Sequence, residues 1–122
     1  MKSLAALRLV AVTHAIAICL QPILAGVYLN GSGDALRIHE PVAMAVGTIA
    51  LIQLLVATIW WRSGGRLAAP LVSLLVLAGE GNQVSLGYSG DLAFHLPLGI
   101  ALVTTAVIFA FWTLRQREEA RA

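Results

Sequence analysis

The stretch "SGDALRIHEPV" at residues 32–42 decides how this sequence folds, because a near copy, "SGDLAFHLPL", stands at residues 89–98. Both copies read Ser-Gly-Asp and then His-x-Pro, with Asp34 and His39 in the first and Asp91 and His95 in the second. A long apolar run follows each copy. Such repetition indicates a duplicated structural unit, in which a polar turn precedes each apolar helix.

The composition is that of a membrane protein. Of the 122 residues, 59% are apolar and only 11% are charged, whereas an average soluble domain has about 25% charged residues. A spanning helix needs about 20 mainly apolar residues, and four such runs occur, at residues 6–29, 35–61, 67–88 and 92–114. The sequence predicts an all-α fold, an integral membrane four-helix up-down-up-down bundle that forms a single domain over residues 1–122.

Charge and aromatic residues at the ends of the runs predict the orientation. Basic residues flank the first run, fill the second connection and follow the fourth run: Lys2, Arg8, Arg62, Arg66, Arg115, Arg117 and Arg121. By the positive-inside rule we expect a multi-pass protein of the cytoplasmic membrane, with both termini and the tail at 116–122 cytoplasmic. The formal charge of +2 is then a matter of topology, and we expect no nucleic-acid partner. Tyr28 and Tyr88 mark the outer interface, while Trp60, Trp61 and Trp112 mark the inner one.

The repeat extends beyond the opening phrase and defines two helix hairpins. Gln21, Gly26, Tyr28 and Pro41 in residues 1–62 match Gln83, Gly87, Tyr88 and Pro97 in residues 63–115. Because each unit contains two spans, the units are related by an axis along the membrane normal. We expect Asp34 and Asp91 to cap the second and fourth helices, which lie diagonally in the bundle. His39 and His95 then face each other across its centre, near the outer end.

Two histidines that face each other in this way suit the axial positions of a haem. Adjacent helices pack at about 8–10 Å, so diagonal axes lie about 14 Å apart, too far for the two rings to hydrogen-bond but suitable for one iron between them. We predict one haem b with His39 and His95 as its iron ligands, Arg37 paired with a propionate, and Gly47 and Gly99 leaving room beneath the imidazoles. Alternatively, each histidine is an interfacial polar residue and Arg37 a solvated charge. A bare zinc or copper ion is less favoured, because it needs further ligands.

The sequence resembles the haem A synthases in its segments "QPILAG" at 21–26, "QVSLG" at 83–87 and "NGSG" at 30–33, and in a histidine near the outer end of the second and fourth helices. That family has two four-helix bundles, each similar to this chain. The resemblance implies haem ligation by His39 and His95. The family typically has Glu two or three residues before the first of these histidines and Arg just after it, whereas Arg37 precedes His39 here and Glu40 follows it. The cysteine pair found in the outer loop of many members is also missing, so the residues for methyl oxidation are incomplete and whether the chain is an enzyme stays open. A homodimer would restore two bundles.

The function that we predict is a membrane-embedded b-type cytochrome in electron transfer or haem handling, alone, as a homodimer or within a larger respiratory complex. The alternative is a small four-span proton-coupled transporter, working as a dimer with Glu80 as its intramembrane acid. A structural subunit without a cofactor is a third option.

Glu80 lies on one helical stripe with Ser73, Gln83 and Gly87, and His14 and Gln21 form a second stripe on the first helix. We expect a protonated Glu80 to hydrogen-bond Gln21 or Gln83, either as a structural contact or as a proton or quinone site. His14 lies nearer the cytoplasmic end and Val76 stands at its matching position in the second repeat, so we assign His14 no ligand role.

Overall fold

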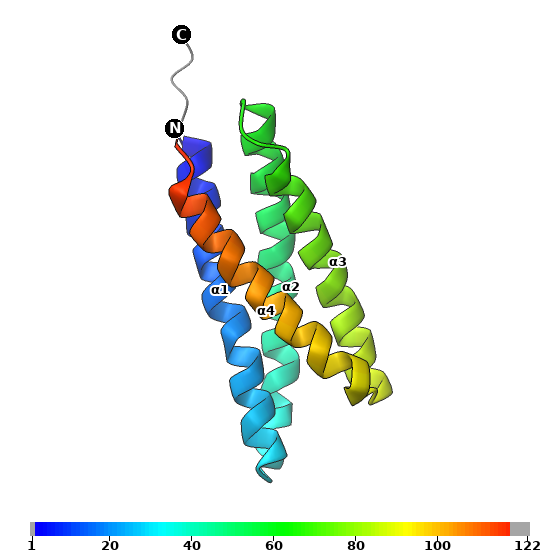
Figure 1. The fold of residues 1–122 in the computed structure, drawn as a ribbon. Coiled ribbons are helices and arrows are strands. Elements are labelled where there is room, and N and C mark those ends of the chain that lie inside the picture. Colours follow the sequence, from blue (N-terminus) through cyan, green and yellow to red (C-terminus); the bar gives the residue numbers. More distant parts are fainter. Residues whose placement is uncertain (1, 118–122) are drawn as a thin grey trace.

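The computed structural model describes residues 2–117, and all of its regular structure is helical. The four helices are α1 (Lys2–Leu29), α2 (Gly33–Arg62), α3 (Ala68–Ser89) and α4 (Leu92–Arg115) (Figure 1). Each predicted apolar run forms one helix, so the all-α prediction is confirmed. Residues 118–122 of the predicted tail lie outside the described residues.

Consecutive helices run in opposite directions and form two hairpins, α1 with α2 and α3 with α4 (Figure 1). α1 packs against α2 and α4, and α3 packs against the same two helices. Within residues 2–117, α1 makes no close backbone contact with α3, and α2 makes none with α4. The helices of each of these two pairs therefore lie diagonally across the bundle. The two histidines of the repeat therefore lie on diagonal helices, as the sequence predicts.

The two hairpins diverge toward their tips, the connections at residues 30–32 and 90–91 (Figure 1). We call this the tip end and the opposite one, with the α2–α3 connection at residues 63–67, the closed end. Burial follows this shape. A core cluster at the closed end contains Leu4, Leu7, Trp60 and Phe109, and a second cluster toward the middle contains Ile18, Val46, Val76, Leu102 and Ala106. Most residues at the tips are exposed.

Trp60 belongs to the closed-end core. Its ring is buried and meets the edge of Trp112 at 6.0 Å between ring centroids, and Phe109 stacks on Trp112 at 5.5 Å. The inward face of α2 therefore packs the indole of Trp60 against α4.

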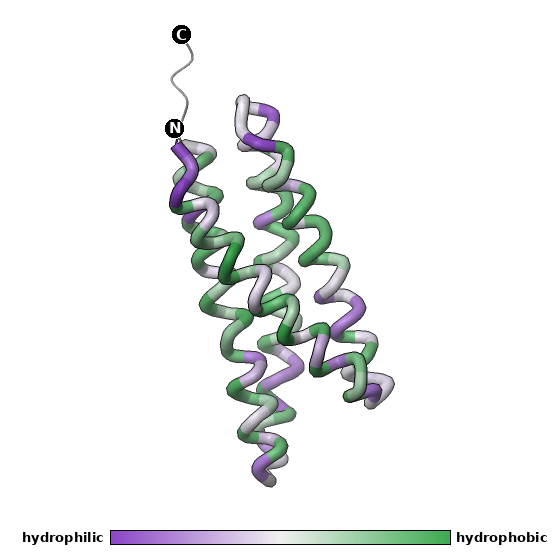
Figure 2. Tube along the Cα trace, in the orientation of Figure 1, coloured by the Kyte–Doolittle hydropathy of each residue, from purple (hydrophilic) through white to green (hydrophobic). Residues whose placement is uncertain are grey.

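Three helices, α1, α2 and α4, are long and apolar enough to cross a membrane. The tube in Figure 2 is accordingly hydrophobic along most of their length. α3 has 22 residues but does not reach the same apolarity. Its tip half contains Glu80, Asn82 and Gln83, which lower its hydropathy. Of the four runs predicted to be long and apolar enough to span a membrane, three therefore form such helices.

The two turns at the tips are built differently. The residue before α2 is Ser32, and Asp34 lies within the first helical turn, so the prediction that Asp34 caps this helix is wrong. Asp91 does precede α4, although its side chain makes no capping hydrogen bond. Gly90, with a φ of 73°, ends α3 in a left-handed conformation that glycine adopts without steric cost. This turn fixes where α4 begins and hence the level of His95.

Candidate functional site

His39 and His95 meet between the two hairpins at the tip end. Their ring centroids are 6.3 Å apart and their planes are inclined by 53°. Both rings are partly buried, and the hydrogen bonds within residues 2–117 include none between them. One ring comes from α2 and the other from α4. The duplicated hairpin thus brings the repeated histidines together.

Each histidine is held by the glutamine of the same repeat. The Nε2 of Gln83 donates to the backbone carbonyl of His95 over 2.8 Å, and the Nε2 of Gln21 donates to that of His39 over 3.3 Å. Sequence reasoning identified both glutamines but gave them the wrong neighbour. Their role is to fix the helices that bear the histidines.

The protonation of the His95 ring follows from its partner. Its Nδ1 lies 3.0 Å from the backbone carbonyl of Gln83, which only accepts hydrogen bonds, so Nδ1 carries the proton. The lone pair of Nε2 is then free to bind a metal ion, the arrangement in which metal-ligating histidines are usually held. The matching Nδ1 of His39 is buried without a hydrogen-bond partner. The first repeat is the looser half of the site.

The separation of the rings matches axial ligation of one metal ion. An imidazole nitrogen binds a first-row metal ion at about 2 Å, so two coaxial imidazoles on one ion have ring centres about 6 Å apart. The observed distance is 6.3 Å. Residues 2–117 contain no group of three or more His, Cys, Asp or Glu side chains that could hold a metal ion. Two histidines suit haem iron, because the macrocycle supplies the other four ligands.

The other residues predicted for the haem site are Arg37, Gly47 and Gly99, and each of them has different surroundings. Arg37 is exposed, two residues before His39. A Cβ on Gly47 would approach Glu80 Oε2 at 4.0 Å, and a Cβ on Gly99 would lie 2.8 Å from Gln83 Nε2. Neither glycine has an imidazole as its nearest neighbour.

The glycine that lies against an imidazole is Gly87. A Cβ there would meet His95 Cε1 at 3.3 Å and Nδ1 at 3.6 Å. The sequence signal for it was present, because Gly87 matches Gly26 in the repeat. At Gly26, however, a Cβ would meet nothing within 4 Å.

A second group of polar side chains is buried between the tip end and the closed end. His14 is 0% exposed, and its Nε2 lies 2.7 Å from Glu80 Oε1 while its Nδ1 lies 3.1 Å from Gln53 Oε1. Gln53 in turn donates from Nε2 to Ser73 Oγ over 3.2 Å. We call His14, Gln53, Ser73 and Glu80 the buried network. It joins α1, α2 and α3.

The predicted partners of Glu80 are wrong. Gln21 and Gln83 hydrogen-bond the backbone of the histidines, and Glu80 pairs with His14 instead. His14 stands seven residues before Gln21, which is about 10 Å along a helix. The α1 residue at the level of Glu80 is thus two turns from the one expected. Gln53 was missed, although it is the only glutamine within the predicted run at 35–61.

One exposed hydrogen bond joins the hairpins beside the histidines. The hydroxyl of Tyr88 on α3 donates to Glu40 Oε1 on α2 over 2.5 Å. Glu40 follows His39 directly, and Tyr88 follows Gly87, which contacts His95. The bond therefore ties together the two sides of the histidine pair.

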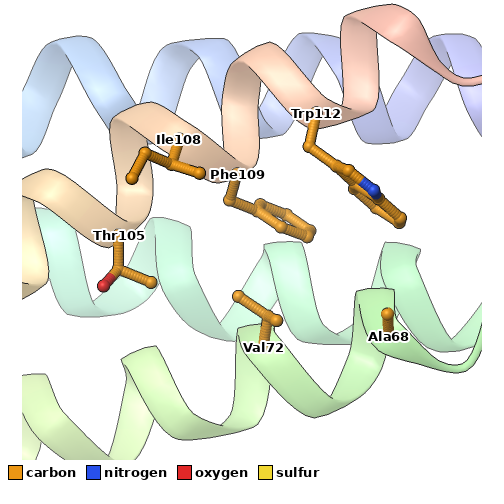
Figure 3. A pocket seen from close by; sticks show the side chains of 6 residues that line it. All are labelled: Ala68, Val72, Thr105, Ile108, Phe109 and Trp112. Carbon is orange, nitrogen blue, oxygen red and sulfur yellow. The ribbon is translucent and has the colours of Figure 1, made fainter.

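The hollows between α3 and α4 offer no comparable chemistry. The one in Figure 3, of about 240 Å³, is almost wholly apolar and is lined by Ala68, Val72, Thr105, Ile108, Phe109 and Trp112. The hydroxyl of Thr105 is bonded to the carbonyl of Ala101 in its own helix. A second hollow lies toward the tip end, between Leu86 and Phe94.

Comparisons of this chain with models of protein families, with curated proteins and with solved structures found no match.

Proposed function

We propose that this chain is a membrane-embedded b-type cytochrome that binds one haem between His39 and His95. The observation that supports this most directly is the pair of rings from diagonal helices with centroids 6.3 Å apart. The carbonyl of Gln83, which keeps the proton on Nδ1 of His95, adds to it. The resemblance to one half of a haem A synthase points to the same cofactor.

Each part of the site has a function in this proposal. Gln21 and Gln83 hold the backbone of the two ligands, and Gly87 allows α3 to approach His95 closely. Arg37 is exposed near His39 and is suited to pair with a propionate. The bound haem would supply a one-electron change at its iron. Because His39 and His95 would both hold the iron, oxygen would find no open position, so electron transfer is favoured over binding of oxygen.

The membrane orientation is part of the same proposal. α1, α2 and α4 are suited to span, and α3 would be shielded in part by its contacts with α2 and α4. The tip end contains the acidic residues Asp34, Glu40 and Asp91 together with Arg37, whereas the closed end contains the basic residues Arg8, Arg62, Arg66 and Arg115. The positive-inside rule then places the closed end and both termini in the cytoplasm. The haem would lie near the outer face.

The test is a visible spectrum of the protein purified in detergent from cells that make haem. We expect a Soret band, with sharp α and β bands after reduction. His39→Ala and His95→Ala should each abolish the six-coordinate spectrum. Asn82→Ala is the matched control, because Asn82 is an exposed polar residue on the tip half of α3 and hydrogen-bonds only the carbonyl of Ala78 in its own helix. A wild-type protein that folds but binds no haem refutes the proposal.

A second candidate, a proton-coupled transporter with Glu80 as its acid, is favoured by one observation. Glu80 Oε2 is buried without a hydrogen-bond partner. In a colourless protein, substrate-dependent proton release that is lost in Glu80→Gln would select this function.

A further inference from the structure

The buried network takes residues from both hairpins, but it has no symmetry-related copy in the repeat. The match of Gln21 with Gln83 places Ala11, His14 and Ile18 opposite Ser73, Val76 and Glu80. The match of His39 with His95 places Gln53 opposite Phe109. Each of the four network positions is thus apolar in the other repeat, and the apolar counterparts Ala11, Ile18, Val76 and Phe109 are buried. A hairpin of this fold can therefore pack with apolar residues at these positions. Since burial of polar groups costs free energy, the packing of the fold does not explain the network.

The hydrogen bonds of the network determine where its protons lie. Gln53 donates from Nε2 to Ser73, so its Oε1 faces His14 as an acceptor and the Nδ1 of His14 carries a proton. One further proton must lie between His14 Nε2 and Glu80 Oε1, which are 2.7 Å apart. Whichever atom holds it, the pair has no net charge. This is the favoured state of two ionisable groups in an apolar interior.

One atom remains free to take another proton. Glu80 Oε2 is buried and has no hydrogen-bond partner among residues 2–117, in a residue that is 7% exposed. Across from it α2 presents Gly47, where a Cβ would lie 4.0 Å from this oxygen. From α4 the neighbouring cluster contributes Leu102 and Ala106, which do not titrate. Within residues 2–117 no other titratable side chain forms a hydrogen bond or ion pair with the network.

The network also lies close to the histidine pair along α3. Gln83, which holds His95, stands three residues after Glu80 and therefore one helical turn away on the same face. Charges in a protein interior are weakly screened. A negative charge added at the histidine pair would therefore favour a proton at Glu80.

We propose that His14 and Glu80 form a buried proton-binding site that holds one shared proton at rest and takes up a second on Glu80 Oε2 when an electron is added at the histidine pair. The coupling to the electron rests on the proposed function. The balance is one electron from a one-electron reductant, such as a reduced mediator dye, and one proton from water. The added charges cancel, so the interior stays neutral.

The coupled uptake is tested by redox titration of the haem-loaded protein with mediator dyes at several pH values. A tenfold change in proton activity corresponds to about 59 mV for a one-electron couple. We expect the midpoint potential of the wild type to fall with rising pH toward this slope. Glu80→Gln should remove the slope, and Asp34→Asn, which alters an exposed carboxylate at the tip end, should retain it. An equal slope in Glu80→Gln and wild type overturns the coupling.

The proton site itself is tested without haem, by infrared spectroscopy of protein labelled with ¹³C-glutamate. We expect the band of a protonated carboxyl to grow as the pH is lowered, to vanish in Glu80→Gln and to persist in Asp34→Asn. In His14→Gln the band should be stronger at neutral pH, because no imidazole remains to take the shared proton. If neither the wild type nor His14→Gln has a band from a protonated glutamate at any pH at which it stays folded, the site is refuted. A wild type without haem refutes the proposed function, and the infrared result still decides the proton site.

Discussion

Within one duplicated fold, the residues of the histidine pair are repeated in both copies, whereas those of the buried network are not. His39 and Gln21 are repeated as His95 and Gln83 and meet across the axis between the hairpins. His14 and its partners occur once, beside apolar counterparts. A group on the axis meets the same residues of both copies, whereas a group off the axis meets different residues of each copy. The repeat therefore separates a symmetric site from an asymmetric one.

The largest difference in stability between the two sites is expected when His14, the central residue of the buried network, is replaced. His14→Leu leaves Glu80 and Gln53 buried without their partner, and we expect a loss of about 3–5 kcal/mol in unfolding free energy. In the haem-free protein, His39→Ala should cost less than about 1 kcal/mol, because the ring is only partly buried. Unfolding in mixed detergent micelles, followed by circular dichroism, measures both. Equal losses would contradict the distinction.

The comparison is sharpened by replacing two residues of the buried network with the residue types at the matching positions of the other repeat. His14→Val together with Glu80→Ile removes both ionisable groups at once. Replacing a whole buried pair by apolar residues is often neutral or stabilising by about 1–4 kcal/mol, so the double variant should recover most of what His14→Leu loses. The same unfolding assay checks this. A double variant as unstable as His14→Leu would mean that the fold itself needs the network.

The two glutamines should differ in strength although they are repeated. We expect Gln83→Leu to weaken the hold on haem by about 1 kcal/mol, or roughly fivefold, and Gln21→Leu by less. The reason is geometric, since the bond of Gln83 is 2.8 Å long and that of Gln21 is 3.3 Å. Transfer of haem to an excess of an acceptor protein gives both rates. A larger effect of Gln21→Leu would reverse the order of the two halves.

The smallest effects should come from the repeated glycines. Gly87→Ala places a Cβ 3.3 Å from His95 Cε1 and should displace the ring slightly, speeding haem loss about twofold. Gly26→Ala meets nothing and should leave haem loss unchanged, with a gain in helix stability of about 0.5–1 kcal/mol. The same transfer assay compares them. Identical behaviour would show that the second repeat does not fit its histidine more tightly.

The repeat predicted which residues would meet on the axis, because symmetry relates positions without knowledge of how the helices are staggered. It therefore identified His39, His95, Gln21 and Gln83. Away from the axis, the sequence indicates which face of a helix is buried but not which residue of the neighbouring helix lies at the same height. Glu80 was therefore paired with Gln21, two turns from its partner His14 on α1, or with Gln83, one turn from Glu80 on α3. For the same reason Gln53 was overlooked, and Gly87 was named in the repeat without its role beside His95. Their roles depend on which atoms stand opposite.

Arg8 on α1 donates to the backbone carbonyls of Thr113 and Gln116 at the end of α4. These carbonyls belong to the last turn of a helix, where partners from the helix itself run out. α1, which is synthesised before α4, thus supplies partners for carbonyls at the end of α4. Residue 116 must be synthesised before Arg8 can form both of these hydrogen bonds between α1 and α4. Until then the guanidinium of Arg8 must hydrogen-bond to water or lipid headgroups.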